Sequence, residues 1–143
     1  MTDAAFWDAR YSEYELAYGD APNDFLREQA YRIPPGRVLC LAEGQGRNAL
    51  HLAALGYDVT AVDQSSAGLA RARKLAAARG LDLTLVEADL NHFVIEPGAW
   101  QGIVATYAHL PPELRGRVHR AAAAGLAPGG VFILEAYTPA QLA

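Results

Sequence analysis

The sequence predicts an α/β fold in which helices flank a doubly wound parallel sheet of five strands. The first observation behind this prediction is that short apolar runs, typical of buried parallel strands, alternate with segments whose apolar residues recur at helical spacing. The second is a glycine-rich turn directly after the first apolar run. With 143 residues, of which 52% are hydrophobic, the chain is long enough for one sizeable core.

The rest of the chain is arranged around residues 37–63. Val38 to Leu41 is a wholly apolar run and predicts a strand, and Gly44 and Gly46 then allow a tight turn. A helix ended by Gly56 and a second strand ended by Asp63 follow. The predicted buried stripe of this helix consists of Leu50, Leu52, Ala53 and Leu55.

The acid at the end of the second predicted strand indicates a nucleotide cofactor. Asp63 lies 63 − 43 = 20 residues after Glu43, the spacing at which a βαβ unit offers a carboxylate to a ribose diol. The turn from Gly44 to Ala49 also fits the looser dinucleotide pattern, so a nicotinamide-dependent oxidoreductase is one alternative. Glu43 argues against it, because an acid there would repel a pyrophosphate. S-adenosylmethionine has two cationic groups, a ribose and no phosphate, and is the predicted cofactor.

The other elements follow from the same signals. A helix starts at Gln64-Ser65-Ser66 and ends at Gly80. Its apolar stripe is Leu69, Ala72, Leu75 and Ala76. The remaining predicted elements are, in order, a strand from Leu81 to Val86, a strand from Gln101 to Thr106, a helix from Pro111-Pro112 to Gly125, a turn at Pro128-Gly129-Gly130 and a strand from Val131 to Leu134. We interpret this order as a regular strand–helix alternation that ends in a final strand.

Residues 1–36 are predicted to form a helical cap ahead of the sheet domain at 37–143. Aromatic residues gather near the start of the chain, with Phe6, Trp7, Tyr11, Tyr14 and Tyr18 before Gly19. They fit either a lid helix that packs on the sheet domain or a segment that contacts the ligand. A further helix, capped by Asn23, is expected to run to about Tyr31.

Composition argues against several classes of partner and site. Twelve basic and sixteen acidic residues give a net charge of −4, so neither nucleic acid nor an anionic membrane is favoured. Cys40 is the single cysteine, expected in the core, and the sequence suits a reducing cytoplasm. No apolar segment is long enough to span a bilayer, and the first residues do not form a basic leader. The four histidines show no metal-ligand spacing, so no metal site is expected.

With these residues placed, the chain resembles the class I S-adenosylmethionine-dependent methyltransferases. The resemblance covers residues 37–137 and is carried by LAEGQG at 41–46, Val62-Asp63, EADL at 87–90 and LAPGG at 126–130. The segments AEGQGRNAL, FWDARY and AHLPP are most similar to the small-molecule branch typified by tellurite-resistance and thiopurine methyltransferases.

The resemblance implies a Rossmann-like sheet of order 3-2-1-4-5 and a set of cofactor-binding residues. Family members usually add a sixth and a seventh strand, and we expect both to be absent from this chain. We therefore expect a truncated chain, a gene fragment or a homodimer that covers the edge of the fifth strand. The implied cofactor-binding residues are Glu43, Gly44 and Gly46 at the methionine end, Asp63 and Gln64 at the ribose, Asp89 and Leu90 at the adenine, Trp7, Arg10 and Tyr11 as an N-terminal cover, and in addition Asn48 and, after the fourth strand, Tyr107.

The function predicted from the sequence is in-line methyl transfer to a small-molecule acceptor. His109 follows the fourth strand and is the candidate catalytic residue, although it would equally serve as a polar loop residue that caps the next helix. Asp89 has a similar alternative as a turn-forming residue. No Asn-Pro-Pro-Tyr or Asp-Pro-Pro-Tyr follows the fourth strand, which lowers the odds of a nucleic-acid substrate. A non-catalytic cofactor-binding fragment is the remaining alternative.

Overall fold

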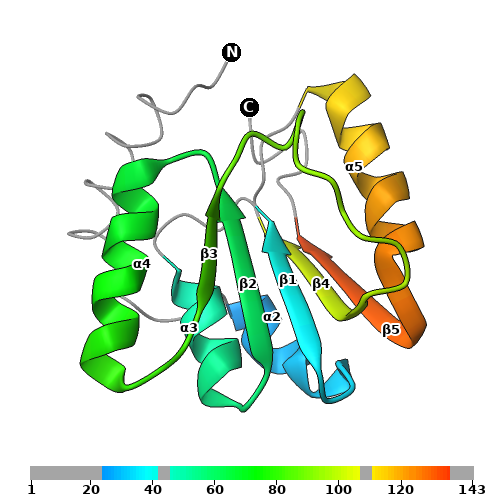
Figure 1. The fold of residues 1–143 in the computed structure, drawn as a ribbon. Coiled ribbons are helices and arrows are strands. Elements are labelled where there is room, and N and C mark those ends of the chain that lie inside the picture. The colour runs from blue at the N-terminus through cyan, green and yellow to red at the C-terminus, as the bar shows by residue number, and fades with distance from the viewer. Residues whose placement is uncertain (1–23, 42–45, 107–110, 136–143) are drawn as a thin grey trace.

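A computed structural model describes residues 24–41, 46–106 and 111–135 (Figure 1). Within these ranges five parallel strands form one sheet of order β3-β2-β1-β4-β5, which confirms the predicted fold class. The strands are β1 (Arg37–Leu41), β2 (Asp58–Asp63), β3 (Thr84–Glu87), β4 (Trp100–Thr106) and β5 (Leu126–Glu135). The helices are α2 (Asp24–Gln29) with a 3-10 turn (Ala30–Arg32), α3 (Arg47–Ala54), α4 (Ser66–Arg79) and α5 (Pro112–Gly125).

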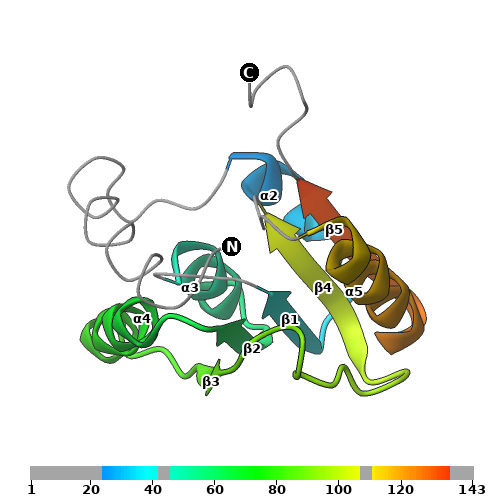
Figure 2. The same ribbon diagram turned by 90° about the horizontal axis from the view of Figure 1, so that it is seen from above.

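The central strand β1 shows why its sequence is apolar throughout. Val38 and Cys40 belong to a core cluster on one face of the sheet, together with Leu26 of α2 and Leu52 of α3. Leu39 and Leu41 belong to a second cluster on the other face, with side chains of α5 and of residues 88–99. Seen from above in Figure 2, α2 and α3 lie on one side of the sheet and α5 on the other. A strand covered on both faces has no solvent side for polar residues.

Helix α4 begins and ends where its sequence predicts. Ser65 caps its start, with the side-chain oxygen accepting a hydrogen bond from the Gly68 amide at 3.1 Å. At the other end Gly80 is left-handed (φ 66°), and the Leu81 amide donates to the Ala76 carbonyl at 2.9 Å. Because Leu81 is used in this helix cap, β3 starts at Thr84 and the predicted start at Leu81 is wrong.

Two further details of the predicted first helix are settled by the structure. Gly56 ends α3 with a positive φ of 99°, as expected. The expected burial of Leu55 is wrong, because its side chain is 56% exposed. Leu55 is the C-cap residue of α3, whose last helical residue is Ala54, so its side chain lies where the chain leaves the helix for the turn at Gly56.

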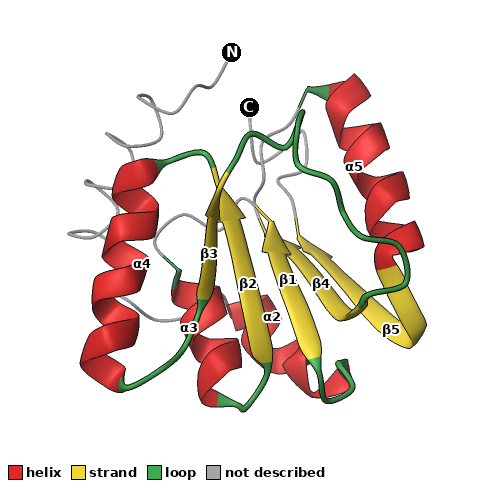
Figure 3. Cartoon of the chain, viewed as in Figure 1, coloured by secondary structure: helices red, strands yellow, loops and turns green. Residues whose placement is uncertain are grey.

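The connection from β3 to β4 contains no helix, contrary to the regular alternation expected from the sequence. Figure 3 shows residues 88–99 as a loop. The amides of His92 and Phe93 both donate to the Asp89 carbonyl, which makes a single turn, and the chain then continues without regular structure. Ile95 is buried and Phe93 is half-buried against the second core cluster. The loop therefore covers part of the sheet with its own side chains.

The last strand also starts earlier than expected, at Leu126 and not at Val131. Trp100 pairs with Leu126, whereas Gly102 pairs with Val131, so residues 127–130 form a bulge opposite Gln101. The predicted turn at Pro128-Gly129-Gly130 is this bulge, and Gly129 has a positive φ of 81°. The turn is present, but inside the strand and not before it.

The segment ahead of the sheet is part of the fold. Leu26, Ala30 and Ile33 are buried in the same core cluster as Val38 and Cys40. Asn23 and the aromatic residues before it lie outside the described residues, and the division of the chain at residue 36 stays a prediction. In the described ranges no helix has the length and apolar character that crossing a membrane requires.

Candidate functional site

All five strands run in the same direction, so their carboxyl ends form one edge of the sheet, here called the carboxyl edge. In the register, Leu41 of β1 is paired with Val62 of β2 and Ala105 of β4, and Asp63 is paired with Glu87 of β3. The arrow tips in Figure 1 and the view from above in Figure 2 show this edge. Six predicted site residues are described and follow these strand ends: Gly46, Asn48, Asp63, Gln64, Asp89 and Leu90.

The carboxylate of Asp63 is held in place at the end of β2. Its side chain is only 4% exposed. The Ser65 amide donates to Oδ1 at 2.8 Å, and the Asp63 carbonyl accepts a hydrogen bond from the Ala88 amide at 2.9 Å. A buried carboxylate in such a fixed position is suited to accept hydrogen bonds from a pair of hydroxyl groups.

The end of β3 repeats this arrangement with Asp89. The Asn91 amide donates to Asp89 Oδ1 at 2.8 Å, and the Asn91 side-chain nitrogen donates to the same oxygen at 3.2 Å. Asp89 thus starts a turn, which confirms the alternative interpretation of this residue. Its predicted contact with adenine stays a prediction. The neighbouring Leu90 is half-buried and packs against the second core cluster.

Gly46 lies where the turn after β1 enters helix α3. Its backbone is left-handed (φ 84°, ψ 12°), and its carbonyl accepts the Leu50 amide at 2.7 Å. A Cβ added here would come within 2.6 Å of Ala72 Cβ on α4. Glycine is therefore required by conformation and by helix packing, independently of any ligand. In the first turn of α3, Asn48 is 8% exposed.

The other predicted site residues are outside the described ranges. They are Trp7, Arg10, Tyr11, Glu43, Gly44, Tyr107 and His109. Their roles stay predictions.

The three described histidines occupy the helix-surface and loop positions expected of them. His51 is half-buried on α3, and burial, together with the positive charge of Arg27, lowers its pKa. His92 is exposed in the loop, and His119 on α5 contacts the Phe132 ring edge-to-face with centroids 5.9 Å apart. In the part of the chain that the structure describes, no three His, Cys, Asp or Glu residues are grouped as metal ligands. Cys40 is fully buried in β1, as predicted.

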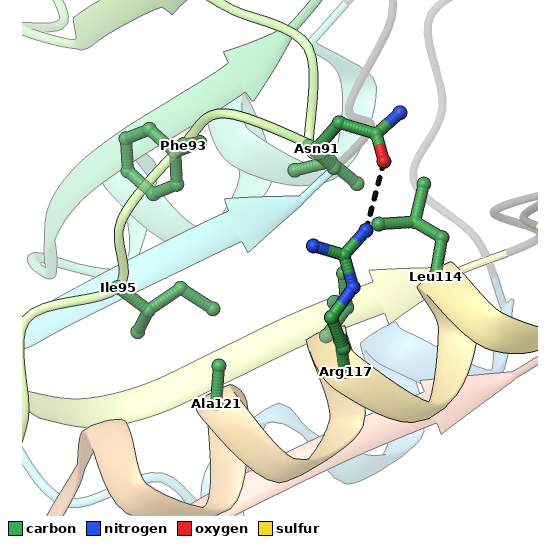
Figure 4. A pocket seen from close by; sticks show the side chains of 8 residues that line it. Asn91, Phe93, Ile95, Leu114, Arg117 and Ala121 are labelled. Atoms are coloured by element: carbon green, nitrogen blue, oxygen red, sulfur yellow. Dashed lines mark hydrogen bonds between the residues drawn. The ribbon is translucent and has the colours of Figure 1, made fainter.

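Two polar residues beside the site were not identified from the sequence. Arg117 of α5 donates to the Asn91 side-chain oxygen at 2.9 Å, and Figure 4 shows this bond bridging the helix and the loop. Both residues line a cavity of about 260 Å³, whose apolar lining includes Leu90, Phe93, Ile95, Leu114 and Val118. The Asp89-x-Asn91 spacing is a local turn signal that could have identified Asn91. Arg117 has no such signal, because it is 26 residues away in the chain.

Comparison with known proteins identifies relatives that are similar in sequence. Residues 38–130 match the family described as "Methyltransferase domain". A stretch of 59 residues is 39% identical to the probable S-adenosyl-L-methionine-dependent methyltransferase TehB of Haemophilus influenzae, covering 41% of this chain and 21% of that protein. Carboxy-S-adenosyl-L-methionine synthase of Geobacter sp. is 38% identical over 81 residues, covering 54% of this chain and 33% of the relative.

Solved structures extend the similarity to most of the chain. The crystal structure of TehB from Haemophilus influenzae superposes with a TM-score of 0.75 at 26% identity, covering 87% of this chain and 44% of TehB. The structure described as a DhpI-SAH complex gives a TM-score of 0.72 at 27% identity, covering 92% of this chain and 66% of DhpI. The chain thus spans about a fifth to a third of these two curated relatives and about half to two thirds of these two structures.

Proposed function

The chain belongs to the family of class I S-adenosylmethionine-dependent methyltransferases, and from this premise we propose that it binds S-adenosylmethionine at the carboxyl edge and transfers the methyl group to a small-molecule acceptor. The observation that carries the proposal is the buried carboxylate of Asp63 at the end of β2, beside the end of β3. It occupies the position in the βαβ unit from which a carboxylate can accept both hydroxyl groups of a ribose.

The residues at the carboxyl edge fit this cofactor. The glycine turn leads into the N-terminus of α3, where Gly46 has the left-handed conformation of a tight turn. We assign the methionine end of the cofactor to this turn, with Glu43 and Gly44 as its predicted partners. Asp63 and Gln64 would hold the ribose, and Asp89 and Leu90 the adenine. Trp7, Arg10, Tyr11, Asn48 and Tyr107 complete the proposed set.

The chemical demand on the protein is small. When bound, the cofactor supplies a methyl group that is already activated by the sulfonium. The side chains of the chain then have to orient the cofactor, align the acceptor with the methyl group and exclude water. We propose that His109, which follows β4, receives or orients a proton of the acceptor.

A small acceptor is supported by the charge and by the sequence after β4. The net charge of −4 does not favour binding to nucleic acid or to an anionic membrane. The segment Tyr107-Ala108-His109-Leu110-Pro111-Pro112 differs from the Asn-Pro-Pro-Tyr type used on planar amino groups. The single buried cysteine, Cys40, suits a reducing compartment, and we propose a cytoplasmic protein.

We also propose that a second copy of the chain covers β5. Among the described strands β5 pairs only with β4, so its outer edge has no neighbour there, and Leu134 on this strand is 39% exposed. An uncovered apolar edge favours association with another strand. Sedimentation analysis of the purified chain should detect a dimer, and a monomer at every concentration would contradict this part of the proposal.

Titration calorimetry with S-adenosylhomocysteine and, separately, with NAD tests the cofactor. We expect saturable binding of the first and none of the second, and the reverse result would favour an oxidoreductase. An assay of methyl transfer to thiols, metalloid oxyanions and halides then tests the acceptor class. Binding without transfer to any of them would favour the alternative that the chain is a non-catalytic cofactor-binding unit.

A further inference from the structure

Three polar side chains connect the end of β3 to the surface of α5. Asp89 Oδ1 accepts hydrogen bonds from the Asn91 amide at 2.8 Å and from Asn91 Nδ2 at 3.2 Å. Asn91 Oδ1 in turn accepts a hydrogen bond from Arg117 Nη2 at 2.9 Å. In Figure 4 the Arg117 side chain extends from the helix to the loop and ends at Asn91. We call this set of residues the Asp89–Asn91–Arg117 chain.

Arg117 and Asp89 together determine the orientation of the Asn91 side-chain amide. A guanidinium group has only donors, and a carboxylate has only acceptors. The amide therefore has to present its oxygen to Arg117 and its nitrogen to Asp89. If it were flipped, oxygen would face the carboxylate and nitrogen would face the guanidinium, and both contacts would be repulsive. Without Arg117 the amide loses one of the two partners that favour the orientation seen here, and only the 3.2 Å contact with Asp89 remains to favour it.

The orientation of the amide decides how the Asp89 carboxylate is used. Two donors from Asn91 converge on Oδ1, which fixes the rotation of the carboxylate about its bond to Cβ. In the described part of the chain, Oδ2 has no hydrogen-bond partner. This oxygen can accept a hydrogen bond from a ligand at the carboxyl edge without any loss to the turn.

We propose that Arg117 is a positioning residue for cofactor recognition, which acts through Asn91 to hold Asp89 as the acceptor for the exocyclic amino group of adenine. This inference rests on the proposed function, because it assumes that the adenine lies at the end of β3. It adds Asn91 and Arg117 to the site, and both act on the ligand only through their effect on Asp89. It also makes the selectivity for adenine over other bases depend on the hydrogen bond between Arg117 of α5 and Asn91 of the loop, which are 26 residues apart in the sequence.

The experiment compares S-adenosylhomocysteine with its hypoxanthine counterpart, in which a carbonyl oxygen replaces the exocyclic amino group. The measured quantity is the ratio of the two dissociation constants, determined by calorimetry on the full chain. A carboxylate acceptor binds the amino group and repels the carbonyl oxygen, so the wild type should prefer the adenine ligand. In Arg117→Met, which retains an apolar stem over the cavity, the preference should fall about fivefold, the value of one hydrogen bond.

Two further variants separate positioning from general effects. Arg115→Ala removes the same charge from an exposed position on α5 and should leave the preference unchanged. Arg117→Lys keeps a donor and a charge and should restore part of the preference. If Arg117→Met weakens both ligands equally, the residue has only a structural role and the inference is wrong.

The wild type separates this inference from the proposed function. If it binds neither ligand, the proposed function fails. If it binds both ligands with equal affinity, the proposed cofactor site is retained, but Asp89 does not recognise the exocyclic amino group. In that case only the inference is overturned. If it prefers the adenine ligand and Arg117→Met retains that preference in full, the inference is again overturned while the proposed function remains.

Discussion

The two edges of the sheet use their polar residues differently. At the carboxyl edge, Asp63 and Asp89 are each held by the main-chain amide two residues further on, at 2.8 Å in both cases. At the opposite edge, where the strands begin, side chains bind one another and nearby carbonyl groups. Substitutions of acids at the carboxyl edge should therefore change ligand affinity, whereas substitutions at the other edge should change stability.

The edge where the strands begin, here called the amino edge, is stabilised by contacts within the protein. The Arg37 guanidinium lies over the Trp100 ring, 4.2 Å from its centroid, and is 3.7 Å from Glu96 Oε2. The Arg37 amide donates to Gln101 Oε1 at 2.7 Å. Tyr57 donates its hydroxyl hydrogen to the Ile33 carbonyl at 2.6 Å, with the Ala30 carbonyl 3.2 Å away. These groups link the starts of β1, β2 and β4 to the segment before β1.

The largest expected effect is at Gly46, which is at the carboxyl edge but is required for folding. Gly46→Ala places a side chain on a left-handed residue and forces it against Ala72, so we expect a loss of about 3 kcal/mol of stability. Gly80→Ala is the matched control, because Gly80 is also left-handed but has open space around its Cβ position. It should cost about 1 kcal/mol. Equal losses in chemical denaturation would show that the contact with Ala72 relaxes without cost.

Asp63 tests the functional side of the comparison. Asp63→Asn retains an oxygen for the Ser65 amide but removes the charge, and we expect affinity for S-adenosylhomocysteine to fall by about 2 kcal/mol. Its register partner Glu87 is exposed at the end of β3, so Glu87→Gln removes a charge from the same edge and is the control. Calorimetry that shows the same loss for both variants would reduce the role of Asp63 to general electrostatics.

The fold could be predicted largely because its strongest signals are local. A strand buried on both faces is marked by an apolar run, as in Val38 to Leu41, and helix ends are marked by residues such as Ser65 and Gly80. The errors occur where tertiary contacts decide. The loop between β3 and β4 covers the sheet with Phe93 and Ile95 in place of a helix, and the start of β5 is extended by pairing of Leu126 with Trp100.

In the candidate site, the sequence could indicate positions only where a local pattern marks them, and the roles of these residues stay predictions. Asp63 is identified by its place at the end of an apolar strand, and the structure buries it there. Arg117 could not be identified, since its contact with Asn91 depends on how α5 packs against the loop. For Gly46 the sequence suggested a ligand, whereas the structure supplies a second reason in its contact with α4. Local patterns find residues at strand ends but not those that reach them from another element.

Tyr57 tests the amino edge through its hydroxyl group. Tyr57→Phe removes the donor to the Ile33 carbonyl and should cost about 1 kcal/mol of stability without a change in cofactor affinity. Burial raises the pKa of Tyr57 above its usual value of 10.0. The wild type therefore keeps this contribution below pH 10 and loses it as the pH rises through the higher pKa of the folded state. The stability difference between wild type and variant should shrink in that range, and a constant difference would exclude the hydroxyl as its source.

The smallest expected effect is at Arg37, whose side chain is 45% exposed. Its ion pair with Glu96 is solvated and contributes little, so most of the effect should come from the contact with the Trp100 ring. We expect Arg37→Ala to lower stability by about 0.5–1 kcal/mol, and Arg37→Lys to recover only part of it, because an ammonium group cannot stack flat on the ring. Glu96→Gln is the control that removes the ion pair alone. If Glu96→Gln is as destabilising as Arg37→Ala, the ion pair and not the ring contact stabilises the amino edge.

If Arg37→Ala also weakens S-adenosylhomocysteine binding, the two edges are coupled through β1, and the division between a stabilising edge and a binding edge fails.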